Sequence, residues 1–429
     1  MRVLWLTQTP AGASELLKYK FPGTGWISSL QEHIKRAPNL ALGISFFHNS
    51  DEFKFEDDDV MYYPIKLQDS SFIGKIYHRI TANLYDSNII ALLKVVEDFK
   101  PDIIHLFGTE TGMGEIISHT KIPVVTHLQG LINPYTYAWF PKGVSRWQVL
   151  LHSSIKSMIV RSGYFFEHKF FRKRSVREEK IIASGKYFFG RTHWDKNFIR
   201  IYNKEFDYIH CEEMLRPGFY NATWSDPGNK ELKIVTTVNP YLYKGVEIIL
   251  DTARILKMKS KLKFTWQVIG IPSDHTLVKL IQKLRKGNFD DYNVSFIGSL
   301  KATEDLMNEL LSSDVYVHPS HIDNSPNSVC ESMLLGMPVI AGNVGGISSL
   351  IQHEKTGILY NSHDPFELAG RILEYTDDKD TYIGYGEAAR VVAFERHNPE
   401  EIVNTVLSTY KRMLDSKSAS ELKKQSLLA

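Results

Sequence analysis

Two carboxylates eight positions apart are the residues of this 429-residue chain best placed to do chemistry together. Asp323 follows a short apolar run, 315–318, that we predict to be a strand, and Glu331 lies in the helix expected next. That helix ends at Gly336 and is otherwise mainly apolar, so the charge of Glu331 needs partners. Helical side chains lean towards the helix N-terminus, so Glu331 is expected to point to the mouth of the cleft, where the hydroxyl groups of a ligand could donate to it. The alternatives are that Glu331 pairs with a basic neighbour and that Asp323 only forms a turn.

The same region offers two helix starts that favour a phosphate. Ser325 and Pro326 suit the N-cap and the first helical position, and the glycine-rich loop 342–346 opens the next helix. Helix N-termini carry partial positive charge and unpaired N–H groups that bind anions. We therefore expect one ligand pocket here. Its expected lining includes the five residues Asn324, Ser325, Pro326, Asn327 and Ser328.

Lys244 is a cation at the start of a predicted helix, after the strand 233–238. A cation at the positive end of a helix is unfavourable unless an anion is present, and a diphosphate would provide one. A solvated lysine in a turn is the alternative. Arg191 is a second candidate for phosphate, since its planar fork suits phosphate oxygens; a salt bridge to Asp195 is its alternative.

The first half carries two further loops of interest. Gly23, Thr24 and Gly25 precede a helix, with Ser28 where the dinucleotide fingerprint would have its third glycine; the loop either lets a ligand approach the backbone or is a simple turn. His127 and Gln129 point to one side of a strand. Glutamine can hydrogen-bond but cannot transfer protons at neutral pH. His127 could serve the site or fill the core.

The segment HPSHIDNSPNSVCESMLLGMPVIAGNVGG, residues 318–346, resembles the sugar-nucleotide signature of family-4 retaining glycosyltransferases, the GT-B group also called glycosyl transferases group 1. In that family a second glutamate holds the ribose hydroxyls and a first, eight positions earlier, reaches the transferred sugar. Glu331 matches the second, and Asp323 stands in place of the first with a side chain one methylene shorter. The run Asn324 to Ser328 would then line the donor pocket.

The resemblance also implies roles for the other candidates. Lys244 matches the lysine of an arginine–lysine pair that clamps the donor diphosphate, and Asn239 stands where the arginine would be, so another cation must substitute or phosphate binding weakens. Gln129 stands where many relatives place a histidine near the reacting sugar. The loop at Gly23 is similar to the family's glycine loop. Asp323, Lys244 and Gln129 are thus the catalytic candidates.

The implied reaction is front-face displacement on a nucleotide-diphosphate sugar, a UDP- or GDP-sugar, with no other cofactor and no metal. A retaining glycosidase needs two carboxylates about 5 Å apart, one a nucleophile, and no such nucleophile is recognisable. Catalysis would rest on stabilising the departing diphosphate through Lys244, Arg191 and helix N-termini. The acidic run 56–59 is expected to be a solvated loop.

Short apolar runs alternate with helical patterns, which indicates two doubly wound parallel-sheet α/β domains, expected in the GT-B architecture to face each other across a cleft. We expect a domain at 1–216 on the acceptor side, a linker at 217–231, a nucleotide-sugar-binding domain at 232–398 and a C-terminal helical segment at 399–429 that could pack back on the first domain. The expected strands are 3–7, 42–47, 103–107, 124–128, 187–189, 233–238, 263–269, 294–297, 315–318, 339–340 and 358–360.

Composition sets further limits. The net charge is only +2, and no nucleic-acid-binding motif is recognisable. Two cysteines and no apolar run of about 18 residues suggest a cytoplasmic protein without a membrane span. From 141 to 191, however, twelve Lys and Arg face three Glu. This patch fits an anionic membrane surface, where each basic residue contributes about 1 kcal/mol, an acidic glycan or a lipid diphosphate; a solvated helix face is the alternative.

The leading hypothesis is a hexosyltransferase-like enzyme that builds a bacterial surface polysaccharide or glycolipid, peripheral on the inner face of the plasma membrane. Its partners would be a nucleotide sugar and a glycan or lipid-linked acceptor. Two alternatives stay open. One is a sugar-nucleotide-binding protein that has lost catalysis, suggested by Asn239, Gln129 and Asp323. The other is a different GT-B enzyme, such as a sugar-nucleotide epimerase.

Overall fold

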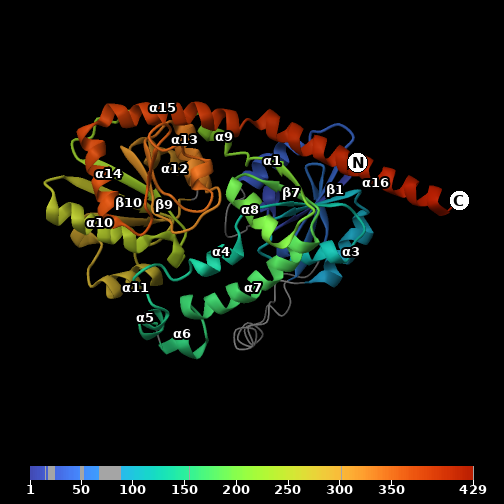
Figure 1. Ribbon diagram of the computed structural model, residues 1–429, viewed down its shortest axis with the longest axis horizontal. Helices are drawn as coiled ribbons and strands as arrows, with labels where there is room; N and C mark the ends of the chain where they lie inside the picture. Colours follow the sequence, from blue (N-terminus) through green and yellow to red (C-terminus); the bar gives the residue numbers. More distant parts are fainter. Residues whose placement is uncertain are drawn as a thin grey trace. The chain divides into compact units, whose positions relative to one another are not determined.

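The computed structural model describes residues 1–14, 16–17, 25–48, 53–66, 88–153, 155–300 and 302–428 (Figure 1). The contacts divide the chain into two compact units. Unit 1 comprises 1–133, 170–214 and 397–429, and unit 2 comprises 134–169 and 215–396. Each unit is built around one sheet of mainly parallel strands, which confirms the expected α/β class with two parallel-sheet domains.

The sheet of unit 1 has eight strands in the order β3-β4-β2-β1-β5-β6-β7-β8. Only the β3–β4 pair is antiparallel among these strand pairs. The strand order reverses beside β1, between β2 and β5, as in doubly wound folds. The strands are β1 Arg2–Thr7, β2 Ala41–His48, β3 Phe55–Asp57, β4 Val60–Lys66, β5 Ile103–Phe107, β6 Val124–His127, β7 Tyr187–Gly190 and β8 Asp207–His210.

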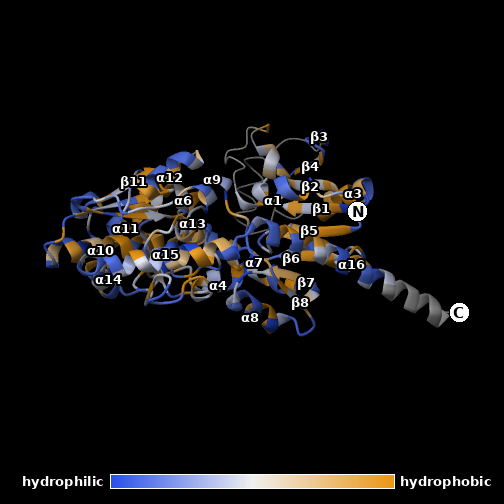
Figure 2. Cartoon of the chain, turned by 90° about the horizontal axis from the view of Figure 1, so that it is seen from above, coloured by the Kyte–Doolittle hydropathy of each residue, from blue (hydrophilic) through white to orange (hydrophobic). Residues whose placement is uncertain are grey.

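Helices cover both faces of this sheet, because alternate residues of a strand point to opposite sides. Val3 and Trp5 pack with α1 and with the C-terminal helix α16, whereas Leu4 and Leu6 pack with α3. Figure 2 shows these central strands mostly in the hydrophobic colour. The helices are η1 Ala11–Ser14, α1 Trp26–Ile34, α3 Ile89–Phe99, η2 Gly112–Ser118, α7 Tyr164–Ser184 (from 170 in unit 1), α8 His193–Tyr202 and α16 Pro399–Leu428.

The sheet of unit 2 has six parallel strands in the order β11-β10-β9-β12-β13-β14. They are β9 Leu232–Thr237, β10 Phe264–Ile269, β11 Val294–Gly298, β12 Val315–His318, β13 Val339–Gly342 and β14 Ile358–Tyr360. Its helices are α4 Ile132–Tyr137 (from 134 in unit 2), α5 Arg146–Leu151, α6 Ile155–Ile159, α9 Pro217–Asn221, η3 Leu242–Lys244, α10 Val246–Lys259, α11 Thr276–Arg285, η4 Asp290–Tyr292, α12 Thr303–Leu311, α13 Asn327–Leu335, η5 Ile347–Ser349, α14 Pro365–Asp377 and α15 Lys379–Arg396.

Several local features differ from the sequence-based expectations. Strands β3, β4 and β8 were not expected, and the acidic run at 56–59 is not all loop: Glu56 and Asp57 lie in β3, paired with β4, while Asp58 and Asp59 form the turn. The structure also groups 134–169 and 217–231 with unit 2. In the second of these segments Phe219 and Trp224 are buried in the unit 2 core.

Candidate functional site

The carboxyl ends of β9, β12 and β13 form the candidate site, because these strands are adjacent and parallel in the sheet of unit 2. Ligands bind at this edge in doubly wound folds. Two glycines let the loops pack closely. Gly245 has φ +74°, and an added Cβ would lie 2.0 Å from the carbonyl oxygen of Pro319; Gly345 has φ +52°, and its Cβ would lie 1.9 Å from the carbonyl oxygen of Asp323. The three loops therefore form one tightly packed surface.

Lys244 and Asp323 meet at the centre of this surface. Lys244 Nζ lies 2.7 Å from Asp323 Oδ2, and His318 Nε2 lies 3.1 Å from the same oxygen. Asp323 is only 5% exposed. Burial raises its pKa, but the charge of Lys244 and the hydrogen bond with His318 more than offset this and hold the pKa well below its usual value. Asp323 is therefore an anion, and Nε2 of His318 carries the proton it donates.

Glu331 is buried on α13 and pairs with Arg216, which lies 115 positions earlier in the chain. Arg216 Nε donates to Oε1 at 2.8 Å and Nη2 donates to Oε2 at 2.6 Å. This is the two-pronged arrangement that a planar guanidinium makes with a carboxylate. Arg216 is the residue before α9, and its guanidinium also lies 4.8 Å from the ring centre of Phe219. The structure thus realises the alternative in which Glu331 pairs with a basic residue, although that residue is not a neighbour in sequence.

A second buried polar cluster ties the same strand ends together. His321 contacts Glu247 through Nε2 and Ser362 through Nδ1 at 3.0 Å, and its ring stacks on His363 with centroids 4.0 Å apart. Glu247 lies in the first turn of α10, directly after Lys244 and Gly245. This cluster therefore joins the loops that follow β9, β12 and β14.

The start of α13 lies one residue later than expected. The helix begins at Asn327, with Pro326 at the N-cap position and no side-chain cap; the sequence had suggested Ser325 as the cap. Asn324 and Ser325 are buried, at 1% and 7% exposure, while Asn327 and Ser328 are intermediate. The segment 324–328 therefore lies between Asp323 and Glu331, as its sequence position requires.

Arg191 lies in unit 1, at the end of β7, and is buried. Its Nε is 3.1 Å from Glu213 Oε2, and its guanidinium lies 4.5 Å from the ring centre of Trp26. Asp195, the partner expected for Arg191 in the alternative without a ligand, lies at the start of α8. It accepts from the backbone N–H groups of Arg191 and Thr192 and completes the capping box of α8.

His127 fills the core of unit 1. It is fully buried and lies among Trp26, Phe107 and Phe189. Burial, together with the charge of Arg191, holds its pKa well below its usual value. Its neutral ring thus behaves as an apolar core side chain.

The other candidates of unit 1 are Gln129 and the glycine loop, and Glu110, which was not among them, lies near Gln129 in a buried place. Gln129 follows β6 and is partly exposed. Glu110 accepts from the backbone N–H of Gly130 at 2.9 Å, and burial raises its pKa to about 7. Gly25 is the exposed residue before α1, whereas Gly23 and Thr24 lie outside the described residues.

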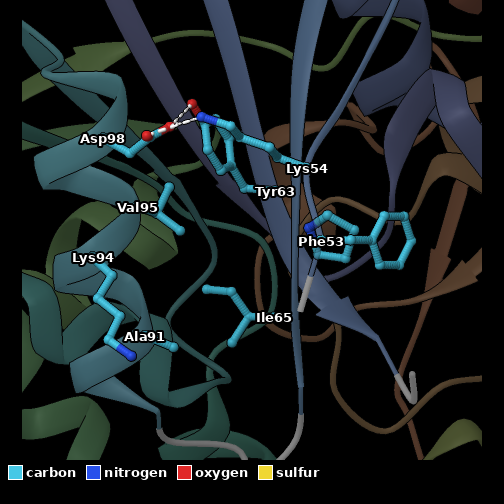
Figure 3. Close-up of a pocket in the computed structure, with 9 residues that line it drawn as sticks. Phe53, Lys54, Tyr63, Ile65, Ala91, Lys94, Val95 and Asp98 are labelled. Atoms are coloured by element: carbon cyan, nitrogen blue, oxygen red, sulfur yellow. Dashed lines mark hydrogen bonds and ion pairs between the residues drawn. The ribbon is translucent and has the colours of Figure 1, made fainter. Parts of the chain in front are cut away.

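Unit 1 also has a hollow of about 270 Å³ between β4 and α3, on the flank of the sheet (Figure 3). Asp98 closes one end by accepting from Lys54 and from the hydroxyl of Tyr63, both at 2.8 Å. The rest of the lining is mainly apolar: Phe53, Pro64, Ile65, Ala91, Lys94 and Val95. None of the site residues predicted from sequence lines this hollow.

Sequence reasoning missed Arg216, His318, Glu247 and His321. A histidine at the end of a predicted strand was a usable signal for His318. Arg216 gave no signal, because it precedes Pro217 in a stretch that is typical of a linker.

Among the described residues, no helix has both the length and the apolar character needed to cross a membrane.

Comparison with known proteins identifies the sequence family through unit 2. Residues 224–392 match the family described as "Glycosyl transferases group 1". The sulfoquinovosyl transferase SQD2 of Arabidopsis thaliana is 27% identical over 336 residues, which is 75% of this chain and 58% of that protein. A D-inositol 3-phosphate glycosyltransferase of Pseudarthrobacter chlorophenolicus is 24% identical over 56% of this chain and 59% of its own length. The chain thus spans less than two thirds of these relatives.

Solved structures share the fold over nearly the whole chain. Sucrose-phosphate synthase from Thermosynechococcus elongatus superposes with a TM-score of 0.66 at 14% identity, covering 97% of this chain and all of that one. Anabaena Alr3699/HepE, solved with UDP-glucose, gives 0.63 at 15% identity, covering 96% of this chain and all of that one. Both sheets take part in this likeness. Residues 224–392 thus match the group 1 glycosyltransferases in sequence, and the chain has the GT-B fold of two parallel-sheet α/β domains.

Proposed function

We propose that this glycosyltransferase moves a hexose from a nucleotide-diphosphate sugar to a glycan or lipid-linked acceptor, with retention of configuration and without a metal. The observation that carries the proposal is the buried Lys244–Asp323 pair at the strand ends of unit 2. Burying an ion pair costs desolvation free energy that the attraction between the two charges often does not repay, so stability alone does not explain this pair. The pair is useful where a diphosphate and a sugar must be bound side by side.

Lys244 is the group proposed to bind the diphosphate. It stands where the chain enters α10, so the donor's phosphate oxygens would meet both its charge and the N–H groups of the helix start. Asp323 keeps the ammonium oriented before the donor arrives. Since both Lys244 and His318 contact Oδ2, the carboxylate is held in one orientation while it accepts from a hydroxyl of the transferred sugar.

Glu331 is proposed to bind the ribose hydroxyls while it stays paired with Arg216. An ionised carboxylate offers about four acceptor positions, and a guanidinium that binds both oxygens uses two of them. Arg216 therefore acts as a positioning residue that keeps Glu331 ionised and fixed. The polar segment Asn324 to Ser328, at the start of α13, would supply further contacts to the nucleotide.

The proposed reaction is a front-face displacement. The bond from the anomeric carbon to the diphosphate oxygen breaks, a bond from the acceptor oxygen forms on the same face, and the acceptor proton passes to the leaving phosphate. The charge that develops on the diphosphate is stabilised by Lys244 and by helix N-termini. Gln129 is proposed to hydrogen-bond the sugar. Arg191 is buried and paired with Glu213, so its proposed contribution is to shape the unit 1 loop.

The relatives support a role in surface glycans or glycolipids. One is an amylovoran biosynthesis glycosyltransferase of Erwinia amylovora, 25% identical over 41% of this chain, and another is the sulfoquinovosyl transferase. The solved relative with UDP-glucose supports a UDP-sugar donor, with a GDP-sugar as the alternative. We place the enzyme in the cytoplasm, at the inner face of a bacterial plasma membrane that its basic segment 141–191 would contact.

The direct test is incubation with a panel of UDP- and GDP-sugars, with and without lipid-linked acceptors and with a chelator present. Transfer in the chelator, with a product whose anomeric configuration by NMR equals that of the donor, is the expected result. Inverted configuration or activity abolished by the chelator would refute the mechanism. Saturable binding without transfer or hydrolysis would instead favour a binding protein, as the exchanges at Asn239 and Asp323 suggest, and interconversion of the donor would indicate an epimerase.

A further inference from the structure

Two short consecutive helices of unit 2, α5 and α6, expose an unusual row of large apolar side chains. Trp147 is 66% exposed, Leu151 80%, Ile155 73% and Ile159 74%. Trp147 and Leu151 are four residues apart, as are Ile155 and Ile159, so each pair lies on one face of its helix. We name these four residues the α5–α6 surface; Figure 1 labels the two helices that carry it. Contiguous exposed apolar patches of this kind mark interaction sites in folded proteins.

The outward orientation of α5 is set by the local structure. Ser145 and Gln148 form a complete capping box at the start of the helix, and the opposite face is anchored by Val149, which is 1% exposed. Arg285 on α11 donates to the carbonyl oxygen of Gly143 at 3.2 Å, just before the helix. Trp147 and Leu151 are therefore held away from the core by a helix whose other face is already packed.

The charged residues of the segment that carries this surface are all of one sign. Residues 141–161 contain four Lys and Arg and no Asp or Glu. Lys142, Arg146 and Arg161 are exposed, and the guanidinium of Arg146 lies 4.7 Å from the ring centre of Phe165 and 5.8 Å from that of Trp147. An apolar row bordered by cations fits an anionic lipid layer, in which apolar side chains enter the acyl boundary and basic groups meet the phosphates.

We propose that the α5–α6 surface docks this enzyme onto an anionic lipid bilayer. Tryptophan suits this position, because its ring is amphipathic and favours the membrane interface. Helices of six and five residues can lie in the interface but are too short to cross the bilayer. A second copy of the chain fits less well, since a two-fold contact would bring the same cations together.

This inference rests on the membrane partner of the proposed function and sharpens it to four side chains within the broad basic segment 141–191. It does not depend on the donor chemistry. Docking would bring the enzyme to the plane in which a lipid-linked acceptor lies, so that the search for the acceptor becomes two-dimensional.

The test is sedimentation of the full chain with vesicles of phosphatidylcholine, alone or mixed with phosphatidylglycerol. The variant Leu151→Glu/Ile155→Glu should bind the mixed vesicles at least about tenfold more weakly, because two apolar contacts become two repulsive charges. The matched control is Ile201→Glu, on α8, where the native side chain is 71% exposed and the change should leave binding intact. A charge variant, Lys142→Gln/Arg146→Gln, should lose the preference for phosphatidylglycerol.

Three results would overturn the inference. They are equal binding by the double variant and the wild type, equal loss in the Ile201→Glu control, and a wild-type dimer in light scattering that the double variant converts to monomer. Melting curves and UDP binding by calorimetry, measured on the same samples, show that the variants are folded and that the donor site is intact. If vesicle binding fails while UDP still binds, the docking proposal alone is wrong; if UDP fails to bind while vesicles do, the proposed donor chemistry is wrong.

Discussion

Arg216 grips both carboxylate oxygens of Glu331, at 2.8 and 2.6 Å, although the two residues are 115 positions apart. The Glu331 side chain is buried, at 4% exposure, and the Arg216 side chain is partly buried, at 19%. A carboxylate held in this way is ionised and cannot rotate. That is the state in which it would bind two neighbouring hydroxyls of a ribose.

Glu331→Ala should weaken nucleotide binding. Hydrogen bonds to a charged group are worth about 1.5–3 kcal/mol, so we expect UDP affinity to fall by roughly tenfold to a hundredfold in calorimetry, while circular dichroism shows a folded protein. The control is Glu354→Ala, an exposed glutamate on the same unit, which should bind as the wild type does. An unchanged affinity in Glu331→Ala would disprove the ribose assignment.

Arg216→Ala should act through Glu331 rather than on the chemistry. Leaving a buried charge without its partner costs about 3–5 kcal/mol in the fully buried case, and the partial exposure of Arg216 reduces this. We expect a lower denaturation midpoint and a higher KM for the donor, with kcat changed less. Arg216→Lys retains the charge but not the two-pronged geometry, so its KM for the donor should lie between those of the wild type and Arg216→Ala. A drop confined to kcat would contradict a positioning role.

Lys244→Met should damage catalysis more than folding. The variant removes the cation proposed to stabilise the departing diphosphate, and removal of one such group typically costs about 10²–10³ in kcat. The matched control is Lys257→Met, a lysine in the last turn of α10 that donates to Asn293; its turnover should stay within a few-fold of wild type. Turnover of Lys244→Met within a few-fold of wild type would rule out the diphosphate role.

The strongest sequence signals were short and local. The strand Val315–His318 was predicted with its observed bounds because four apolar or amphipathic residues end at a polar loop, and its burial is complete. The candidate residues Asp323 and Glu331 followed from their spacing after that strand. Lys244 was placed correctly at a helix start by the periodicity of the residues after it.

Long-range contacts were out of reach of such reasoning. Residues 217–231 are rich in turn formers and were interpreted as a linker, yet Trp224 is 5% exposed and donates from Nε1 to the carbonyl oxygen of Ser313 at 2.7 Å. The segment 134–169 groups with unit 2 through contacts such as the one from the Tyr164 hydroxyl to the carbonyl oxygen of Pro240, at 2.9 Å. No local pattern encodes a partner 76 or 89 residues away.

Glu110 should make the stability of unit 1 depend on pH. Burial raises its pKa to about 7, whereas in the unfolded chain its pKa should lie near the ordinary glutamate value of 4.5. Between these values the folded state binds more protons than the unfolded state, so the free energy of unfolding decreases as pH rises from about 4.5 to about 7. Each unit of pKa difference is worth about 1.4 kcal/mol.

The variant Glu110→Gln isolates this contribution. It keeps the acceptor oxygen for the backbone N–H of Gly130 but cannot ionise. Urea melts across this pH range should show a smaller decrease in stability for the variant than for the wild type. Parallel pH profiles for the two proteins would show that Glu110 does not titrate with a raised pKa.

Gly345→Ala should destabilise the site loop more than its size suggests. The residue has φ +52°, and the new Cβ would lie 1.9 Å from the carbonyl oxygen of Asp323, which is backbone and has little freedom to move. Strain of this kind costs about 1–3 kcal/mol, and relief of the clash would displace Asp323 from Lys244. We therefore expect both a lower melting temperature and weaker UDP binding.

Gly370→Ala is the matched control, because its Cβ meets nothing within 4 Å and it lies inside α14, where alanine is favoured by about 0.5–1 kcal/mol. If Gly345→Ala melts and binds UDP as the wild type does, the close packing of the β13 loop on Asp323 does not support the donor site.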